Sequence, residues 1–600
     1  MTELYFKGKE FVYNHHLTVP HRPLEMHADK GIGDPRLDGN LILQGDNLHA
    51  LKALLPIYAG KVDCIFIDPP YNTGNESWSY SDSVNAPMIR EWLQDNPINT
   101  DDKLRHDKWC AMMWPRLRLL YDLLSESGSL WVTLDDNEFH RGKQILDEIF
   151  GDESHVATVV WQKADSPKNT AKHFSVDHDY LLVYAKDKES WRPNLIDRTE
   201  AMTARYTNSD NDPRGPWMTG DLDARNYYSK GEYSIQIPGG RLIPGPPKGR
   251  YWTVSEDKFW KLDADNRIYW GADGKSEPNV KKFLSEVRDG VVPQTLWRWQ
   301  DAGSTRHSKT EIVRIMGGSE EDIFVTPKPT KLIDRILKVA TDADSIVLDS
   351  FAGSGTTAHS VLKANQQDSG NRKFILVEME GYANELTAER VRRVSQGYDF
   401  TGKTKTELLR EKLTWSWLNK ADRLKEQIEK IENLHGHEFD EIKKTVKNGE
   451  LIVTGEKKVE KRVEGLGGEF TYCTLGAPIE MDKILTGETL PPFVDLATVL
   501  FHTATNLPGD PAKVDSDTFF MGEANGQILW LVYKPELDWL KTPDAALSLS
   551  FARKIGEEHP KARHLVFAPA NHTNPKMLAK EGLKVEFAPL PYALYRVEKA

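Results

Sequence analysis

The residues between 67 and 74, IDPPYNTG, carry groups that could act on a flat ring bearing an amine. Asp68 follows an apolar run and supplies an acceptor carboxylate. Pro69 and Pro70 stiffen the chain and donate no backbone hydrogen bond, so carbonyl groups here can face outward. A rigid strand-to-loop turn would explain a bare Asp-Pro-Pro. The aromatic face of Tyr71 changes this interpretation and favours a catalytic tetrad, Asp68 to Tyr71, for a planar base with an exocyclic amine.

A second stretch, IVLDSFAGSGTT at residues 346–357, resembles the start of a ligand site. A strand should end at Asp349 and a helix should begin at Thr356. The free N–H groups at the N-terminus of that helix can bind a carboxylate or phosphate. Gly353 and Gly355 let the backbone pass close to a ligand, where a Cβ would collide. The residues that we expect to line this cofactor site are Asp349, Phe351, Ala352, Gly353, Ser354, Gly355, Thr356 and Thr357.

An acidic residue completes the second pattern. The apolar run FILVE ends in Glu378, and an acid at a strand tip can accept both ribose hydroxyls of an adenosine ligand. The loop does not follow GxGxxG, which makes a pyrophosphate ligand less favoured. A glycine turn without a ligand is the alternative, but strand, loop, helix, second strand and acid together favour an adenosine-bearing cofactor.

The elements around both stretches predict an α/β fold. Apolar strands alternate with amphipathic helices over residues 40–189, which indicates a mainly parallel, doubly wound sheet covered on both faces. The long helix in this part should run from 105 to 128. Residues 190–320 are instead rich in Gly, Pro, Arg, Lys and aromatics, and the alternating pattern returns at about 326. The sheet is therefore expected to be interrupted by an insertion and then completed.

The pair DPPY and FAGSGTT resembles the amino-group DNA methyltransferases that use S-adenosylmethionine, and the order of the two motifs resembles the permuted β class. GDNLHALKAL (45–54), with Asp46, is similar to that family's lead-in to DPPY. TPKPTKLIDRIL (326–337), with Lys328, is similar to the segment that packs over the methionine end of the cofactor. The resemblance implies a Rossmann-like methyltransferase sheet and adds Asp46 and Lys328 to the expected cofactor-binding residues.

The resemblance also implies a mechanism. The target base would be flipped out of the duplex and stacked on Tyr71, while the Asp68 carboxylate and the Pro69 carbonyl accept hydrogen bonds from its amino group. Positioning would then supply much of the catalysis, without a metal or a covalent nucleophile. Adenine N6 is favoured over cytosine N4, because the cytosine enzymes of this class usually begin the tetrad with Ser.

Within that class, DPPYNTG, FSVDHDYLLVYAKD (174–187), GGEFTYCTLGAPI (467–479) and the C-terminal part resemble the modification subunits of type III restriction–modification systems. This implies double-stranded DNA as substrate, a homodimer and a separate helicase–nuclease subunit. A methylase of another phage-defence system is the alternative.

The segment before the C-terminal part has apolar residues at helical spacing, namely Trp417, Ala421, Leu424, Ile428 and Ile431. The expected segments are an arm 1–39, a catalytic half 40–189, a target-recognition insertion 190–325, a cofactor half 326–400, a helical linker or dimerisation segment 401–469 and a small α/β domain 470–600.

The insertion is expected to read DNA. Its cations suit phosphates and guanine edges, and its aromatics can stack or wedge. The cations we expect to contact DNA are Arg214, Arg225, Arg241, Lys248 and Arg250. Taken alone, this mixture is more typical of a solvated surface over a small core.

Composition sets wider bounds. The net charge of −12 does not suggest nucleic acid, but binding needs only a local basic surface. The three cysteines show no metal-binding spacing and fit a reducing, cytoplasmic setting, and no apolar run is long enough to span a membrane. A non-catalytic DNA-binding specificity subunit and an RNA methyltransferase remain as alternatives.

Overall fold

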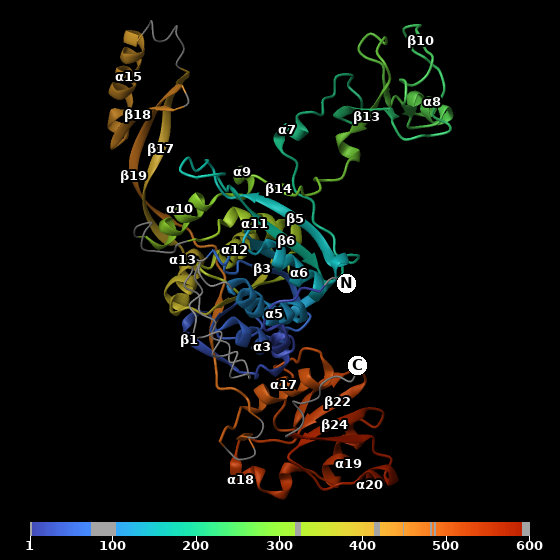
Figure 1. The fold of residues 1–600 in the computed structure, drawn as a ribbon, viewed down its shortest axis with the longest axis vertical. Coiled ribbons are helices and arrows are strands. Elements are labelled where there is room, and N and C mark those ends of the chain that lie inside the picture. Colours follow the sequence, from blue (N-terminus) through green and yellow to red (C-terminus); the bar gives the residue numbers. More distant parts are fainter. Residues whose placement is uncertain are drawn as a thin grey trace. The chain divides into compact units, whose positions relative to one another are not determined.

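One ten-stranded sheet brings the two motifs together (Figure 1). The computed structural model describes residues 3–73, 104–317, 326–412, 421–447, 449–480, 483–484 and 488–590. These form two compact units, one of Met1–Arg192 with Gln294–Ala600 and one of Pro193–Pro293. The sheet belongs to the first unit. Its strands, in spatial order, are β1 (Leu24–Ile32), β20 (Phe470–Leu475), β2 (Leu41–Gln44), β16 (Lys373–Glu378), β15 (Ile346–Asp349), β3 (Val62–Ile67), β4 (Leu124–Leu134), β6 (His178–Ala185), β5 (His155–Gln162) and β14 (Leu296–Trp297).

The strands from β20 to β4 run parallel to one another, as predicted for an α/β fold. β3 pairs with β15 in the register Cys64 to Val347 and Ile65 to Leu348. The last four residues of β3 are all buried, which is typical of a strand covered on both faces. Because parallel neighbours end at the same edge, the residues after β3 and after β15 emerge side by side although 280 positions separate Asp68 from Leu348.

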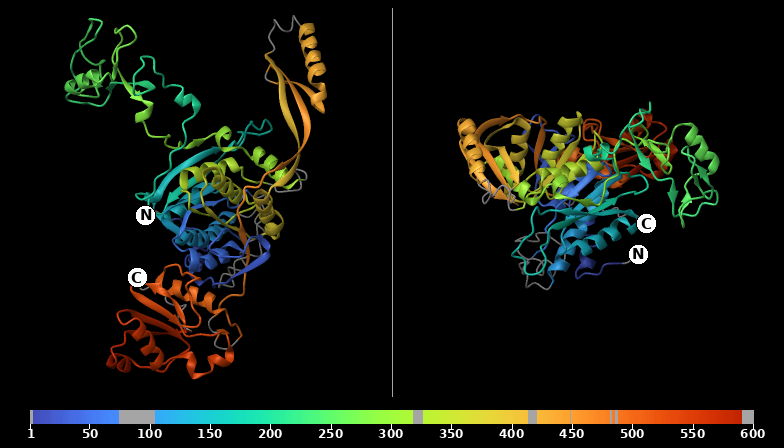
Figure 2. Two further views of the ribbon diagram at one scale, coloured as in Figure 1. Left: turned by 180° about the vertical axis from the view of Figure 1, so that it is seen from behind. Right: turned by 90° about the horizontal axis from the view of Figure 1, so that it is seen from above.

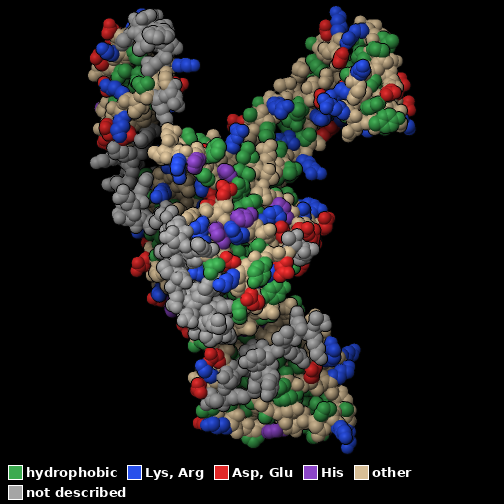
Figure 3. All heavy atoms as spheres, in the orientation of Figure 1, with side chains coloured by type: hydrophobic (Ala, Val, Ile, Leu, Met, Phe, Trp, Pro, Cys, Tyr) green, Lys and Arg blue, Asp and Glu red, His purple; other side chains and the backbone are tan. Residues whose placement is uncertain are grey.

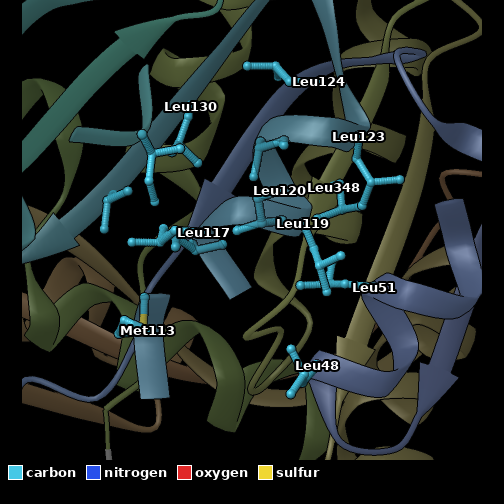
Figure 4. Close-up of a cluster of buried hydrophobic side chains, with 14 of the residues drawn as sticks. Leu48, Leu51, Met113, Leu117, Leu119, Leu120, Leu123, Leu124, Leu130 and Leu348 are labelled. Carbon is cyan, nitrogen blue, oxygen red and sulfur yellow. The ribbon is translucent and has the colours of Figure 1, made fainter. Parts of the chain in front are cut away.

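Helices cover both faces of the sheet. One layer contains α3 (Asn47–Tyr58), α5 (Arg105–Leu123) and α6 (Phe139–Phe150), which pack on one another and bury a leucine-rich cluster against the strands (Figure 4). The cluster includes Leu130 and Leu348 of the sheet. Alternate strand residues such as Phe374 are buried on the opposite face. The helices of this second layer are α11 (Thr330–Ala340), α12 (Thr356–Asp368) and α13 (Glu389–Gln396).

Two expected boundaries differ in the structure, the end of the long helix and the start of the C-terminal part. α5 ends at Leu123, because Leu124 already pairs with Val62 as the start of β4, so the helix does not continue to Gly128. The arm 1–39 contains α1 (Lys9–Val12), α2 (His15–Thr18) and β1, a full strand of the sheet. β20 lies between β1 and β2, so residues 470–475 belong to the central sheet and not to a C-terminal domain.

The segment 401–469, expected to be helical, is mostly β structure. β17 (Tyr398–Lys412), β18 (Glu441–Lys447) and β19 (Glu450–Val463) form an antiparallel sheet, and α15 (Ala421–His435) lies alongside it (Figure 2). Its Glu and Lys residues suggest a helix, but cross-strand pairing over the length of β17 and β19 overrides that preference. The predicted helical spacing holds within α15, and Trp417 lies outside the described residues.

The C-terminal part of the larger unit contains a second, smaller α/β sheet. Its sheet contains β21 (Phe520–Ala524), β22 (Gln527–Leu531), β24 (Arg563–Ala568) and β26 (Val585–Pro589). α17 (Phe493–Thr505) and α19 (Leu549–Glu558) belong to two separate apolar clusters that take alternate residues of β22 and β24. The two helices therefore cover opposite faces of this sheet.

The unit Pro193–Pro293 is shorter than the expected insertion, because α9 (Trp299–Ala302) and α10 (Thr305–Met316) belong to the larger unit. It contains short elements around a small core that includes Ile235 and Phe259. Its elements are α7 (Glu200–Thr203), β7 (Trp217–Gly220), β8 (Asp223–Ala224), β9 (Ile235–Gln236), β10 (Leu242–Ile243), β11 (Tyr251–Trp252), α8 (Glu256–Ala264), β12 (Ile268–Tyr269) and β13 (Asn279–Phe283). Across the described part of the chain, every helix is too short or too polar to cross a lipid bilayer.

Candidate active site

Asp68 stands at the carboxyl end of β3 and is held from two sides. Its Oδ1 accepts a hydrogen bond from Thr133 Oγ1 of β4 at 2.5 Å, and its Oδ2 is paired with Lys328 Nζ. The carbonyl of Pro70 accepts from Trp109 Nε1 at 2.7 Å. Of the two proline carbonyls, that of Pro70 is thus already used, so the predicted contact with a target amine stays with Pro69.

Tyr71 is fixed by its hydroxyl and by a cation over its ring. The hydroxyl donates to Asp179 Oδ2 at 3.4 Å, and Lys163 Nζ approaches the other carboxylate oxygen of Asp179 to 2.6 Å. Lys328 Nζ lies 5.1 Å from the centre of the Tyr71 ring. Burial, with the neighbouring carboxylates Asp68 and Asp179, holds the pKa of Tyr71 well above its usual value, so the ring stays a neutral phenol.

Asn72 shapes the turn that follows Tyr71. It has φ 58°, the left-handed region that Asn tolerates better than most residues. Its Nδ2 donates to Glu138 Oε1 at 2.5 Å and to the Arg105 carbonyl at 3.2 Å. His106 Nδ1 also lies 2.5 Å from Glu138 Oε1. Burial raises the pKa of Glu138 to about 7, and this buried carboxyl ties the turn to the starts of α5 and α6.

The glycine loop is organised by Asp349. Its two oxygens accept from the Phe351 N–H at 3.0 Å and from Thr357 Oγ1 at 2.6 Å, and burial raises its pKa to about 7. Gly355 has φ 77°, and a Cβ there would lie 3.0 Å from the Thr387 carbonyl oxygen. Gly353 also has a positive φ, of 50°. The loop therefore needs glycine at both positions, which fits the predicted close approach of backbone to a ligand.

A buried guanidinium also holds the glycine loop in place. Arg390 of α13 is 1% exposed and donates to Ser354 Oγ at 3.0 Å and Thr356 Oγ1 at 2.8 Å. Thr387 Oγ1 donates to the Gly353 carbonyl at 2.6 Å. These contacts fix the backbone at the N-terminus of α12, where anion-binding N–H groups are expected.

Glu378 holds the loop instead of standing free at its strand tip. Its Oε2 accepts from the Gly353 N–H at 2.7 Å and its Oε1 from the Glu380 N–H at 3.0 Å, and burial raises its pKa. Each carboxylate oxygen can accept a second hydrogen bond, so binding of ribose hydroxyls stays a prediction. Asp46 caps α3 through the Leu48 N–H at 2.8 Å, and its neighbour Asn47 contacts the Ser350 carbonyl at 3.1 Å.

Lys328 lies beside the predicted catalytic tetrad, a position that no local sequence pattern indicated. We predicted it to bind the cofactor, and the structure places its ammonium between the carboxylate of Asp68 and the face of Tyr71. A contact with the cofactor stays a prediction. Thr133, Lys163, Asp179, Arg390 and Asn72 were also missed, because each acts through a fold-dependent contact. Asp179 and Asn72 gave a signal, as parts of the stretches 174–187 and DPPYNTG.

The predicted DNA-contacting cations differ in their surroundings. Arg214 pairs with Asp212 at 2.9 Å and Asp265 at 3.1 Å and lies over the Phe283 ring, and Arg250 pairs with Asp223 at 2.9 Å. These two guanidinium groups are already used inside their unit. The remaining predicted contacts, Arg225, Arg241 and Lys248, are exposed. On the visible face, basic and acidic side chains are interspersed over this unit (Figure 3). Within the described ranges, no three His, Cys, Asp or Glu side chains are grouped as metal ligands.

Comparison with known proteins identifies the family. Residues 62–389 match the model of a family described as DNA methylase, and the chain belongs to that family. It is 34% identical over 381 residues to the Mod subunit of the type III restriction-modification enzyme StyLTI of Salmonella typhimurium, a match that covers 59% of this chain and 57% of that subunit. It is 28% identical over 410 residues to the EcoP15I Mod subunit of Escherichia coli, covering 60% and 61%. This chain thus spans less than two thirds of either Mod subunit.

Two further matches differ in kind. The type II methyltransferase M.KpnI of Klebsiella pneumoniae is 28% identical over 355 residues, which cover 56% of this chain and 79% of that enzyme. Among solved structures, the PvuII cytosine-N4-specific DNA methyltransferase overlaps with 58% of this chain and 86% of its own, at 13% identity and a TM-score of 0.31. An overlap of that extent supports no conclusion about this chain.

Proposed function

We propose that this protein transfers the methyl group of S-adenosylmethionine to adenine N6 in double-stranded DNA, as the modification subunit of a type III restriction–modification system. The observation that carries the proposal is the shared sheet edge. Asp68 and Tyr71 follow β3, and the glycine loop follows β15, the neighbouring parallel strand. A base at the first and a methyl donor at the second would therefore meet.

The residues of the first motif suit an amine that must attack a methyl group. When bound, S-adenosylmethionine supplies an electrophilic methyl on a sulfonium sulfur. The Asp68 carboxylate and the Pro69 carbonyl would accept the two amino hydrogens, which directs the nitrogen lone pair away from the ring plane. Tyr71 would hold the flipped base by stacking, and Thr133 keeps the carboxylate in place. Asp68 is also placed to receive the proton that the methylated nitrogen must lose.

The second motif suits the cofactor. The left-handed glycines leave room for a ligand at the start of α12, and Glu378 offers further acceptor positions beside them. Asp349 organises the loop. These residues would bind and orient an adenosine-bearing, cationic ligand, for which a carboxylate-rich pocket is favourable.

For the larger assembly, we propose that Pro193–Pro293 reads DNA, that the chain forms a homodimer in the cytoplasm, and that a separate helicase–nuclease subunit joins it. The names of the two Mod subunits support a type III role. The match to 79% of M.KpnI favours a second candidate, a type II methyltransferase. Specificity for cytosine N4 and a non-catalytic specificity subunit are further alternatives that the experiment below separates.

The experiment is transfer of labelled methyl from S-adenosylmethionine to a mixed-sequence duplex, followed by nucleoside analysis and sequencing of the methylated sites. We expect N6-methyladenine at a minority of adenines. Asp68→Asn and Tyr71→Ala should abolish transfer while cofactor binding remains, and Asp344→Asn, an exposed carboxylate, serves as control. Labelled N4-methylcytosine would show that cytosine is the target base. If an RNA of the same sequence accepted methyl groups and the duplex did not, the substrate would be RNA. No transfer despite cofactor binding would favour a non-catalytic subunit.

A further inference from the structure

The side chain of Lys328 occupies the space between the two groups that a target base needs. Its Nζ is paired with Asp68 Oδ2 and lies 5.1 Å from the centre of the Tyr71 ring. Lys328 as a whole is only 9% exposed, so this ammonium has been withdrawn from bulk water. An N–H donor to the Asp68 carboxylate placed against the Tyr71 face is also the arrangement proposed for an exocyclic amine of a base.

The backbone around Lys328 is held independently of this contact. The Lys328 carbonyl accepts from Thr356 Oγ1 at 3.1 Å, and the Pro327 carbonyl accepts from Ser308 Oγ at 2.6 Å. α11 begins two residues later, at Thr330. The chain is thus fixed at both sides, and the long side chain is the part that can move.

We propose that Lys328 is a built-in substitute for the target amine, which satisfies Asp68 and Tyr71 until a flipped base displaces it. The two occupants compete for one position, because the ammonium that pairs with Asp68 Oδ2 also lies over the Tyr71 face on which a base would stack. The inference rests on the proposed function and deepens it. It makes Lys328 a positioning residue that sets how readily a base enters.

A second carboxylate is ready to receive the displaced ammonium. Asp179 is 2% exposed, and its pKa is raised by burial while Lys163 and Lys328 act to lower it, so the charges of Lys328 and Asp179 already interact. A swing of Lys328 from Asp68 toward Asp179 would keep the cation paired while it clears the ring. Lys163 is bonded to the same Asp179 carboxylate at 2.6 Å. Base entry would then cost a rearranged ion pair: the cation stays paired, and the Asp68 carboxylate exchanges it for hydrogen bonds from the base amine beside that from Thr133.

The test compares binding of two duplexes that contain the methylated site found with the wild-type protein. In one, the target adenine lies opposite an abasic position and is free to leave the helix. In the other, the target nucleotide itself is abasic, so no base can enter. We expect Lys328→Ala to bind the first duplex about tenfold more tightly relative to the second than the wild type does. Lys328→Arg, which keeps the cation, should give the wild-type ratio.

Lys331→Ala is the matched control, because Lys331 lies three residues further along, in the first turn of α11, and is exposed. In an Asp68→Asn background, Lys328→Ala should no longer change the ratio, since the ammonium has lost its anionic partner. The inference would be overturned if the ratio of the affinities for the first and second duplex were unchanged or smaller in Lys328→Ala. A tenfold loss of S-adenosylmethionine affinity in calorimetry, without any change in that ratio, would overturn it as well. Lys328→Met gives a second comparison with a side chain of similar length. Failure of the proposed function is distinguishable, because the wild-type protein would then methylate no DNA.

Discussion

Buried charged side chains have different roles in the two units: they hold the loops of the candidate site in the larger unit and stabilise the fold in the smaller one. At the edge of the ten-stranded sheet, Asp349, Glu378 and Arg390 hold loops in the conformation that a ligand would need. In Pro193–Pro293, Arg214, Lys281 and their acidic partners hold the unit itself together. The first unit already has a large apolar core and can use buried polar groups for its site, whereas the second has a small core that ion pairs supplement.

The sharpest test of that difference is Lys281→Met in the small unit. Lys281 Nζ is 3.1 Å from Asp212 and paired with Asp210, and its side chain is 1% exposed. Removing the ammonium takes this buried cation from Asp210 and leaves Asp212 with Arg214, which should cost about 3 kcal/mol. Hydrogen exchange should accelerate within residues 193–293 only. Lys248→Met, at an exposed lysine, is the control, and equal protection in both variants would contradict the comparison.

In the large unit, Arg390→Met should act on the glycine loop. Loss of the guanidinium leaves Ser354 and Thr356 without their buried donor, at a cost of about 2 kcal/mol. We expect a lower melting temperature together with weaker S-adenosylmethionine binding in calorimetry. Arg306→Met, at an arginine whose side chain is 82% exposed, should leave both unchanged. Normal cofactor affinity in Arg390→Met would show that the loop does not depend on this contact.

A smaller effect is expected for the exposed cations of the small unit. Arg225→Ala with Lys248→Ala should weaken DNA binding about tenfold and reduce the slope of log affinity against log salt by about 2, since each phosphate contact contributes about 0.9. Stability should be unchanged, in contrast to Arg214→Ala, which breaks ion pairs with Asp212 and Asp265. Fluorescence anisotropy over a salt series measures the slope. A double variant with the wild-type slope would place the DNA contacts elsewhere.

The smallest effect concerns pH. The pKa of Glu138 is raised to about 7 in the folded protein, so the unfolded chain loses this proton first as pH rises. The stability that the neutral carboxyl contributes is therefore complete below about pH 4.5 and is lost as pH rises toward 7. Between pH 6 and 7 the wild type should lose about 1 kcal/mol more than Glu138→Gln. Asp349, with the same direction, contributes equally to both proteins. Thermal melts of the pair over this range give the difference, and parallel curves would exclude Glu138 as the titrating group.

The central fold was predictable because its strands are continuous apolar runs beside recognisable helices. β3, β15 and β16 and the motifs after them lie where the sequence placed them. Two kinds of feature were not predictable from the local sequence. The pairing of β1 with β20 joins residues more than 400 positions apart, and the ribbon of β17 and β19 is made of charged residues that locally favour a helix.

For the site, residue type and spacing indicated which residues are predicted to contact a ligand, but not which residues contact other side chains. Asp68 and Tyr71 were found from DPPY. Thr133 and Asp179 reach them from β4 and β6, strands whose order in the sheet no local pattern reveals. Lys328 was named for another role, because its ion pair spans the two halves of the permuted core.

The position of β20 has a consequence for synthesis of the chain. Because β20 lies between β1 and β2, β1 and one edge of β2 stay unpaired in the sheet until residues 470–475 have left the ribosome. Until then β1 has no neighbour in the sheet and one edge of β2 is open, which is the arrangement that invites pairing between chains. A chain cut after the cofactor half, near residue 400, would keep every residue of the proposed chemistry and still carry that open edge into solution.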